Sequence, residues 1–226
     1  MDIHKRGFTL VELLTTIAII AILGAILISA VGEVRERAKA TECMTNLRSI
    51  GQGAHLYAVD HNSALPTNEH SGGLAASWMW QLLDYINPEI PNNQRTRAFS
   101  HYFRSPLDEN EERLWSYALN DFLAPSSEAN GAYSVATRLS QVERPESTLM
   151  ATVCTVDYSD SDHFHFTSIS DGASSAFSQQ VATQLHNGEG HYLFADGHVD
   201  SLAWDEVAQR LEPLHPFVAP RPANNL

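Results

Sequence analysis

A nearly unbroken apolar segment runs from Phe8 to Ile28, directly after a short leader, residues 1–7. As a helix rising about 1.5 Å per residue, this segment just spans a bilayer core of about 30 Å. Its one charged residue is Glu12. An ionisable side chain inside a spanning helix costs about 3 kcal/mol, so such a residue indicates a function. The sequence therefore predicts a transmembrane helix with a functional acid near its start.

The charge of the leader predicts the orientation of this helix. Lys5 and Arg6 directly precede the apolar segment, and basic residues beside a membrane segment stay in the cytoplasm. We expect a single pass through the cytoplasmic (inner) membrane, with the remainder of the chain outside. A secretory signal peptide would instead be cleaved after its apolar part. Only the small residues around 28–30 offer such a position.

The helix is expected to continue well beyond the membrane. The chain has no proline before Pro66, and apolar residues recur at helical spacing from Val31 onward. The prediction is one helix over 8–59, of which residues 29–59 pack against a globular head. Four glycines weaken it by about 1 kcal/mol each relative to alanine: Gly24, Gly32, Gly51 and Gly53.

For residues 60–212 the sequence predicts an α+β head with an antiparallel sheet. For residues 213–226 it predicts a proline-rich tail that is extended or disordered. Strands are expected over 114–119, 148–156, 191–195 and 198–202, with the second of them central in the sheet. A buried helix is expected over 78–86 and a short one from Trp204. Residues 92–112 are expected to be rich in loops, and residues 168–178 to be exposed. The Asp196-Gly197 dipeptide fits a type I′ turn.

The head is strongly acidic. The whole chain has a formal net charge of −13, and from Ser49 onward it carries 8 Arg and no Lys against 22 Asp and Glu, or 8 − 22 = −14. This charge argues against nucleic acid as a partner. It permits a divalent cation or a basic partner, although solubility alone also explains it.

Two cysteines, Cys43 and Cys154, leave the disulfide question open. No CxxC spacing indicates zinc. One disulfide is allowed if the head is extracytoplasmic, and two unpaired thiols fit the sequence equally well.

The block at the start of the apolar segment resembles the N-terminus of type IV pilins and type II secretion pseudopilins of bacteria. It reads Gly7-Phe8-Thr9-Leu10-Val11-Glu12. The resemblance implies cleavage between Gly7 and Phe8 by a prepilin peptidase, which also methylates the new amine of Phe8. It further implies that Glu12 offsets the positive amine of a neighbouring subunit, since a buried charge needs a partner.

A second block resembles the C-terminal signature of a large pseudopilin-like family. His186 is followed after nine residues by Asp196-Gly197. Three further segments also resemble that family: 43–57, 116–120 and Arg144-Pro145. Relatives often carry Cys-Pro where this chain has Ser105-Pro106, which implies that a disulfide from this position is absent here.

Histidines and acids in the head allow two further interpretations. His186 with Asp196 either fixes the hairpin or forms a catalytic pair, and a pair needs a nucleophile or a metal within reach. No nucleophile motif such as Gly-x-Ser-x-Gly occurs. Asp157, Asp160 and Asp162 form a weak cation candidate, and the pseudopilin resemblance makes calcium conceivable. The run lacks the central Gly and terminal Glu of an EF-hand.

The main hypothesis is a structural subunit, not an enzyme, that needs no cofactor and assembles into a type II secretion pseudopilus or a type IV pilus-like filament. Its expected partners are other pilin-like subunits through the N-terminal helix, the prepilin peptidase, an inner-membrane assembly platform and membrane lipid. One alternative is an anchored surface protein that binds a glycan or a cation. Another is a tethered metal-dependent hydrolase that uses His186, His191, Asp196 and His198.

Overall fold

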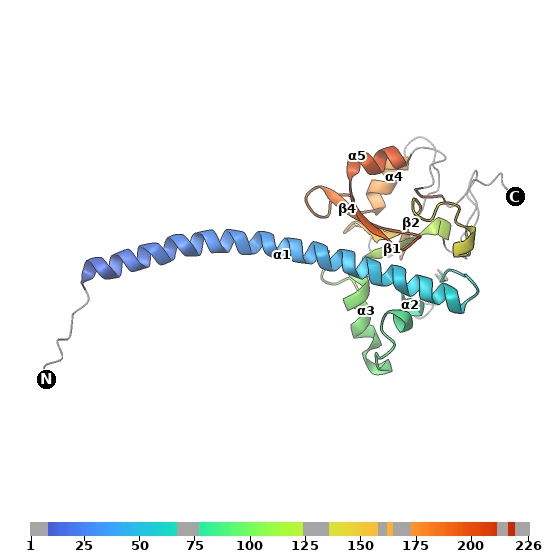
Figure 1. Cartoon of the computed structure of the whole chain (residues 1–226), viewed down its shortest axis with the longest axis horizontal. Coiled ribbons are helices and arrows are strands. Elements are labelled where there is room, and N and C mark those ends of the chain that lie inside the picture. The colour runs from blue at the N-terminus through green and yellow to red at the C-terminus, as the bar shows by residue number, and fades with distance from the viewer. Residues whose placement is uncertain are drawn as a thin grey trace. The chain divides into compact units, whose positions relative to one another are not determined.

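The computed structural model describes residues 9–66, 77–123, 136–157, 162–164, 173–211 and 217–219. The chain divides into two compact units, Met1–Lys39 and Ala40–Leu226. Figure 1 labels the elements of both units.

A single helix, α1, covers Leu10–Asp60 and confirms the expectation of one long helix. It continues through Gly24 and Gly32 without a break, because no proline interrupts it. It ends where Asn62 and Ser63 adopt positive φ values of 54° and 68°. The backbone N–H of Ser63 then donates to the carbonyl of Ala58 at 2.7 Å, which satisfies one of the free carbonyls of the last turn.

The part of α1 inside the second unit buries one stripe of small and apolar side chains. Its members recur every three or four residues: Ala40, Cys43, Leu47, Ile50, Ala54 and Ala58. This spacing is the helical period expected from the sequence.

The head contains one five-stranded sheet in the order β3-β1-β2-β4-β5. The strands are β1 (Tyr117–Asn120), β2 (Leu149–Val153), β3 (His163–Phe164), β4 (Glu189–Phe194) and β5 (Val199–Ala203). The central place of β2 confirms the prediction from its β-branched run. The sheet is antiparallel as expected along β1, β2, β4 and β5, and it is mixed because β3 pairs parallel to β1 at one edge.

Helices cover both faces of this sheet. On one face lie the Ala40–Asp60 part of α1, α2 (Trp78–Ile86) and α3 (Arg95–Phe103), and on the other lie α4 (Ala173–Gln180) and α5 (Trp204–Arg210) (Figure 1). Side chains alternate between the two cores along β4: Leu193 joins the α1 side, while Tyr192 and Phe194 join the α4–α5 side. Short 3-10 turns connect these elements at Asn92–Gln94, Asp121–Leu123 and Leu139–Gln141.

Three segments expected to be loops or tail contribute to the core. Helix α3 lies within the expected loop region 92–112 and buries Phe99 and Phe103. Helix α4 lies within the region expected to be exposed and buries Phe177. Phe217–Ala219 of the expected tail are also buried. In each case one or two aromatic side chains bury enough apolar surface to outweigh the polar residues around them.

Buried Asn120 holds the end of the chain against the sheet. Its side-chain amide donates to the carbonyls of Leu149 (2.7 Å) and Val218 (2.8 Å). The N–H of Leu149 in turn donates to the carbonyl of Phe217 at 2.7 Å. These bonds explain why residues 217–219 are fixed in an otherwise proline-rich stretch.

Candidate functional site

Glu12 lies in the first turn of α1 and closes a capping box with Thr9. Its Oε2 accepts from the backbone N–H (2.9 Å) and the hydroxyl (2.7 Å) of Thr9, and its own N–H donates back to the Thr9 hydroxyl at 3.3 Å. This reciprocal pattern satisfies donors that a helix start leaves unpaired. The second carboxylate oxygen of Glu12 has no hydrogen bond within the described part of the chain, so it is available to an external donor.

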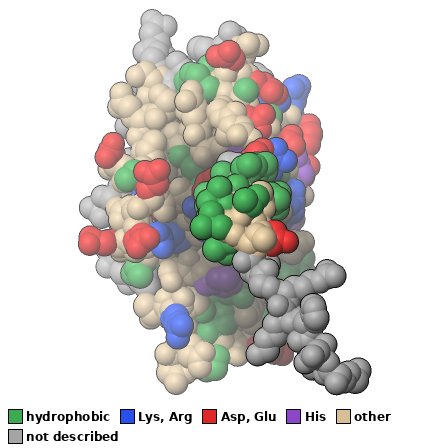
Figure 2. Space-filling view, turned by 90° about the vertical axis from the view of Figure 1, so that its left-hand side faces the viewer, with side chains coloured by type: hydrophobic (Ala, Val, Ile, Leu, Met, Phe, Trp, Pro, Cys, Tyr) green, Lys and Arg blue, Asp and Glu red, His purple; other side chains and the backbone are tan. Residues whose placement is uncertain are grey.

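The side chains around Glu12 are apolar and exposed. Leu10, Leu13, Ile20 and Leu27 are each more than half exposed, and apolar side chains surround this end of α1 (Figure 2). The helix is long and apolar enough to cross a membrane. Gly7 and Phe8, the expected processing junction, lie outside the described residues.

The signature segment 186–198 contains two different turns. Asn187 and Gly188 both have positive φ, 53° and 81°, and His186 and Glu189 exchange two backbone hydrogen bonds across them. This geometry is a two-residue type I′ loop. At the other end of β4, positive φ is confined to Gly197 at 93°.

The expectation of a type I′ turn at Asp196-Gly197 is therefore wrong. Phe194 and His198 flank a three-residue loop, and the N–H of Gly197 donates back to Phe194 at 2.9 Å. A type I turn followed by a left-handed glycine fits this longer loop. Asp196-Gly197 correctly indicated a turn. The length of the loop, however, depends on the register in which β4 and β5 pair, and the sequence does not reveal that register.

The structure separates His186 from Asp196, because one precedes β4 and the other follows it. Asp196 instead contacts His198, with Oδ1 2.5 Å from Nδ1, and the His198 ring stacks on Phe194 at 4.3 Å. The His186 ring contacts Asn187 at 3.1 Å. His186 therefore does not bind Asp196. It fixes the hairpin through its two backbone hydrogen bonds with Glu189.

His191 is buried within β4. Burial lowers its pKa, and the nearby His186 lowers it further. It lies inside β4, whereas Asp196 and His198 follow the end of that strand, so these four hydrolase candidates do not form one cluster. In the part of the chain that the structure describes, no three His, Cys, Asp or Glu side chains are grouped to hold a metal.

The acidic-loop candidate is described only at its ends. Asp157 and Asp162 lie in described residues, and Asp160 lies outside them. Asp162 Oδ1 is 2.8 Å from His163 Nδ1, and its backbone carbonyl accepts from the indole N–H of Trp78 at 2.7 Å. These contacts join Asp162 to the protein core on the α2 side.

Three of the segments that resemble the pseudopilin-like family, namely 43–57, Arg144-Pro145 and the signature, meet where α1 packs on the β4–β5 loop, residues 195–197. His55 Nε2 donates to the carbonyl of Ala195 at 3.0 Å. A Cβ placed on Gly51 would stand 2.8 Å from Leu193 Cδ1 and 3.4 Å from Gly197 Cα. The N–H of Asp196 donates to the carbonyl of Pro145 at 3.1 Å. The signature thus docks the helix on the sheet, and Gly51 permits the close approach.

Replacing Gly51 with valine should destabilise the head by about 2 kcal/mol, because the added atoms overpack this contact. For a head of this size that amounts to a few degrees in thermal midpoint. Gln52→Val places the same side chain on the exposed neighbouring position and should change little. Thermal unfolding followed by circular dichroism measures both. Equal midpoints for the two variants would contradict the docking role of Gly51.

The two cysteines are free and buried in different cores. Cys43 belongs to the core on the α1 side of the sheet and Cys154 to the core on the opposite side. Burial raises the pKa of the Cys43 thiol and raises that of Cys154 to about 12. The structure therefore favours two unreactive thiols over the disulfide that the sequence allowed.

Ser105 occupies the position where a cysteine would reach Cys43. Its hydroxyl donates to Cys43 Sγ at 3.3 Å, and Tyr117 donates to the Cys43 carbonyl at 3.3 Å. The backbone N–H of Ser105 is held by Ser116 Oγ at 2.7 Å. The family resemblance implied that a disulfide from this position is absent here. The hydrogen bond from Ser105 to Cys43 stands in its place.

Ser105→Cys should form a disulfide with Cys43 and stabilise the oxidised head by about 2–4 kcal/mol, because the bond closes a long loop. Reduction should remove the gain. Thiol titration after denaturation, together with melts with and without reductant, provides the measurement. Ser105→Ala is the matched control that cannot cross-link. Two titratable thiols besides Cys154 in air-oxidised Ser105→Cys would show that the geometry does not permit the bond.

A long helix with an apolar, acid-bearing start, followed by an α+β head, defines a pilin-like protein. Residues 3–28 match the family model described as the prokaryotic N-terminal methylation motif. Residues 32–175 match the model described as a protein of unknown function, DUF1559. This second match covers more than half of the chain, so the chain belongs to the DUF1559 family.

One curated relative extends this similarity. The chain is 45% identical over 60 residues to the type IV wide pilus major component PilA4 of Thermus thermophilus. The match covers 26% of this chain and 46% of PilA4, which is about half the length of that relative. No solved structure matches the chain.

Proposed function

We propose that the chain is a membrane-anchored structural subunit, cleaved between Gly7 and Phe8 and methylated on Phe8. It assembles through α1 into a type II secretion pseudopilus or a type IV pilus-like filament. The observation that carries this proposal is the placement of Glu12 in the first turn of an apolar, exposed helix, with one carboxylate oxygen that accepts no hydrogen bond from the described residues.

The chemistry of that placement favours pairing between subunits. Processing frees an α-amine on Phe8, four residues before Glu12. In an apolar setting a carboxylate needs a cationic partner within a few ångströms. The amine of a neighbouring subunit supplies one, while Thr9 holds the carboxylate in position. Before assembly the same helix anchors the subunit in the inner membrane, where the prepilin peptidase and an assembly platform act on it.

A subunit of this kind needs no cofactor and no catalytic step of its own. The signature residues have a structural explanation, because the 195–197 loop docks α1 on the sheet through Gly51 and His55. The relation to PilA4, a pilus component, and the methylation motif support the same proposal.

Shearing of the cell surface tests this function. The full-length chain should appear in sheared filaments that an antibody against the head labels along their length in electron micrographs. Retention of the whole population in the membrane fraction, with unlabelled filaments, would rule out assembly.

That second outcome would favour an anchored surface-binding protein. A cavity in the head, lined by α3 and by the residues that link α2 to α3, favours this second candidate, since a purely structural subunit has no need of one.

A further inference from the structure

We propose that this cavity binds a small organic carboxylate that carries an apolar body. It has a volume of about 520 Å³, within the usual size range of small-molecule sites. Its lining comes from the residues that link α2 to α3, among them Asn87, Ile90 and Pro91, and from one face of α3, among them Arg97, Ala98 and Tyr102.

Helix α3, which carries about half of the lining, is held against α2. Arg95, at the start of α3, forms an ion pair with Asp84 of α2 and lies over the Trp80 ring at 4.9 Å. Trp80 also packs against Phe99 at 6.0 Å between ring centroids. These contacts fix the backbone from which the lining side chains of α3 extend.

Asn87 and Tyr102 form a hydrogen-bonded pair in the lining. Asn87 donates its amide to the hydroxyl oxygen of Tyr102 at 3.0 Å, and its own carbonyl accepts from the N–H of Glu89 at 3.2 Å. The Tyr102 oxygen accepts this bond, and its hydroxyl donates to no group in the described ranges, so its hydrogen can be donated to a ligand. Asn87 therefore orients a donor at the site.

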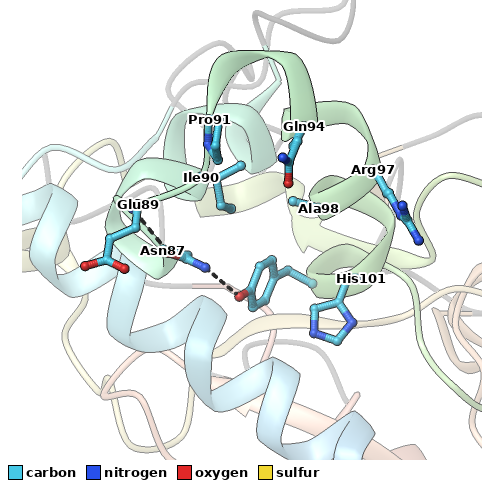
Figure 3. A pocket seen from close by; sticks show the side chains of 9 residues that line it. Asn87, Glu89, Ile90, Pro91, Gln94, Arg97, Ala98 and His101 are labelled. Carbon is cyan, nitrogen blue, oxygen red and sulfur yellow. Dashed lines mark hydrogen bonds between the residues drawn. The ribbon is translucent and has the colours of Figure 1, made fainter.

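One permanent positive charge, that of Arg97, lies on the α3 side. Arg97 and His101 are one helical turn apart and line the same side of the cavity, while the Glu89 carboxylate turns away from both (Figure 3). The Arg97 guanidinium has no ion pair or hydrogen bond within the described ranges of the chain. From Ser49 onward the chain has 22 acids and only 8 arginines. An arginine beside a cavity that pairs with none of the described acids is therefore suited to bind an external anion.

The planar guanidinium of Arg97 and the apolar residues of the lining together narrow the class of ligand. A guanidinium presents parallel N–H donors that match a carboxylate. Ile90, Pro91 and Ala98 supply apolar surface beside these donors. A carboxylate with a compact apolar body, of the size of phenylacetate, satisfies both features, whereas a metal cation would face Arg97.

Fluorine NMR of para-fluorophenylacetate with the full-length chain in lipid nanodiscs tests the site. The probe signal should broaden beyond that seen with empty nanodiscs. Arg97→Gln should weaken binding at least tenfold, because it removes charge-assisted hydrogen bonds. Arg144→Gln removes an exposed arginine outside the cavity and should leave binding unchanged. The neutral amide of the same probe should bind at least tenfold more weakly.

Three results would overturn the proposal: no broadening beyond empty nanodiscs, equal binding by wild type and Arg97→Gln, or equal binding of acid and amide. Arg97 is exposed on α3, so its replacement leaves the fold intact. The site is independent of filament assembly, and its failure would leave the role of Glu12 untouched.

Discussion

Glu12→Ala should remove the subunit from filaments, lowering its incorporation by roughly a hundredfold or more while leaving it in the membrane. Loss of the carboxylate leaves a neighbouring amine without its partner in an apolar setting, which is far costlier than loss of an exposed ion pair. Removal of one acid from the apolar segment does not hinder insertion into the bilayer. Quantitative immunoblots of sheared filaments and membranes measure both quantities.

Two further variants separate charge from helix capping. Glu12→Gln retains an oxygen that can accept from Thr9 and preserves a capping box, but it removes the charge. It should fail to assemble, as Glu12→Ala does. Glu33→Ala removes an exposed acid that pairs with Arg37 on the same helix and should assemble normally. Wild-type assembly of Glu12→Gln would mean that Glu12 only caps the helix.

Arg113→Ala should lower the free energy of unfolding by about 3–5 kcal/mol, the largest effect expected in the head. Arg113 and Asp108 form a buried ion pair, Nε to Oδ2 at 3.3 Å, with side chains 5% and 2% exposed. Arg113 also donates to the carbonyls of Trp115 (3.2 Å) and Thr155 (2.7 Å). Its loss leaves the buried carboxylate without a cation, with only the Asn110 N–H still donating to Oδ1 at 3.0 Å, and removes the Arg113 donors from two carbonyls. Urea unfolding of the full-length chain in nanodiscs measures the change.

A double variant tests whether the unpaired charge causes that loss. Asp108→Asn with Arg113→Met removes both charges and keeps similar volumes, so it should be more stable than Arg113→Ala. Arg138→Ala, which loses an exposed hydrogen bond to the Asn62 carbonyl, should cost less than about 1 kcal/mol. If Arg113→Ala and Arg138→Ala unfolded at the same urea concentration, the buried pair would have no special importance.

Local signals predicted the helices that the sequence punctuates clearly. The expected helix over 78–86 coincides with α2. Ser77 caps its start by accepting from the Trp80 N–H at 3.2 Å, and Pro88 follows its end. Helix α3 was missed because polar residues dominate Arg95–Phe103. The spacing of Phe99 and Phe103, four residues apart, was the available signal.

The contacts that give the signature its role are not local. His55 and Ala195 are 140 positions apart, and Cys43 and Ser105 are 62 apart. Gly51 was interpreted as a weak point in a helix, yet its missing side chain is what admits the 195–197 loop. Strand register decided the turn type at Asp196, and no pattern within one strand reveals the register of a pair.

Mass spectrometry of the N-terminal peptide, taken from sheared filaments, tests the central claim most directly. Processing followed by assembly predicts that the peptide begins with N-methylated Phe8 and contains Glu12. An intact Met1, a first residue near Ser29, or absence of the chain from sheared filaments would contradict it.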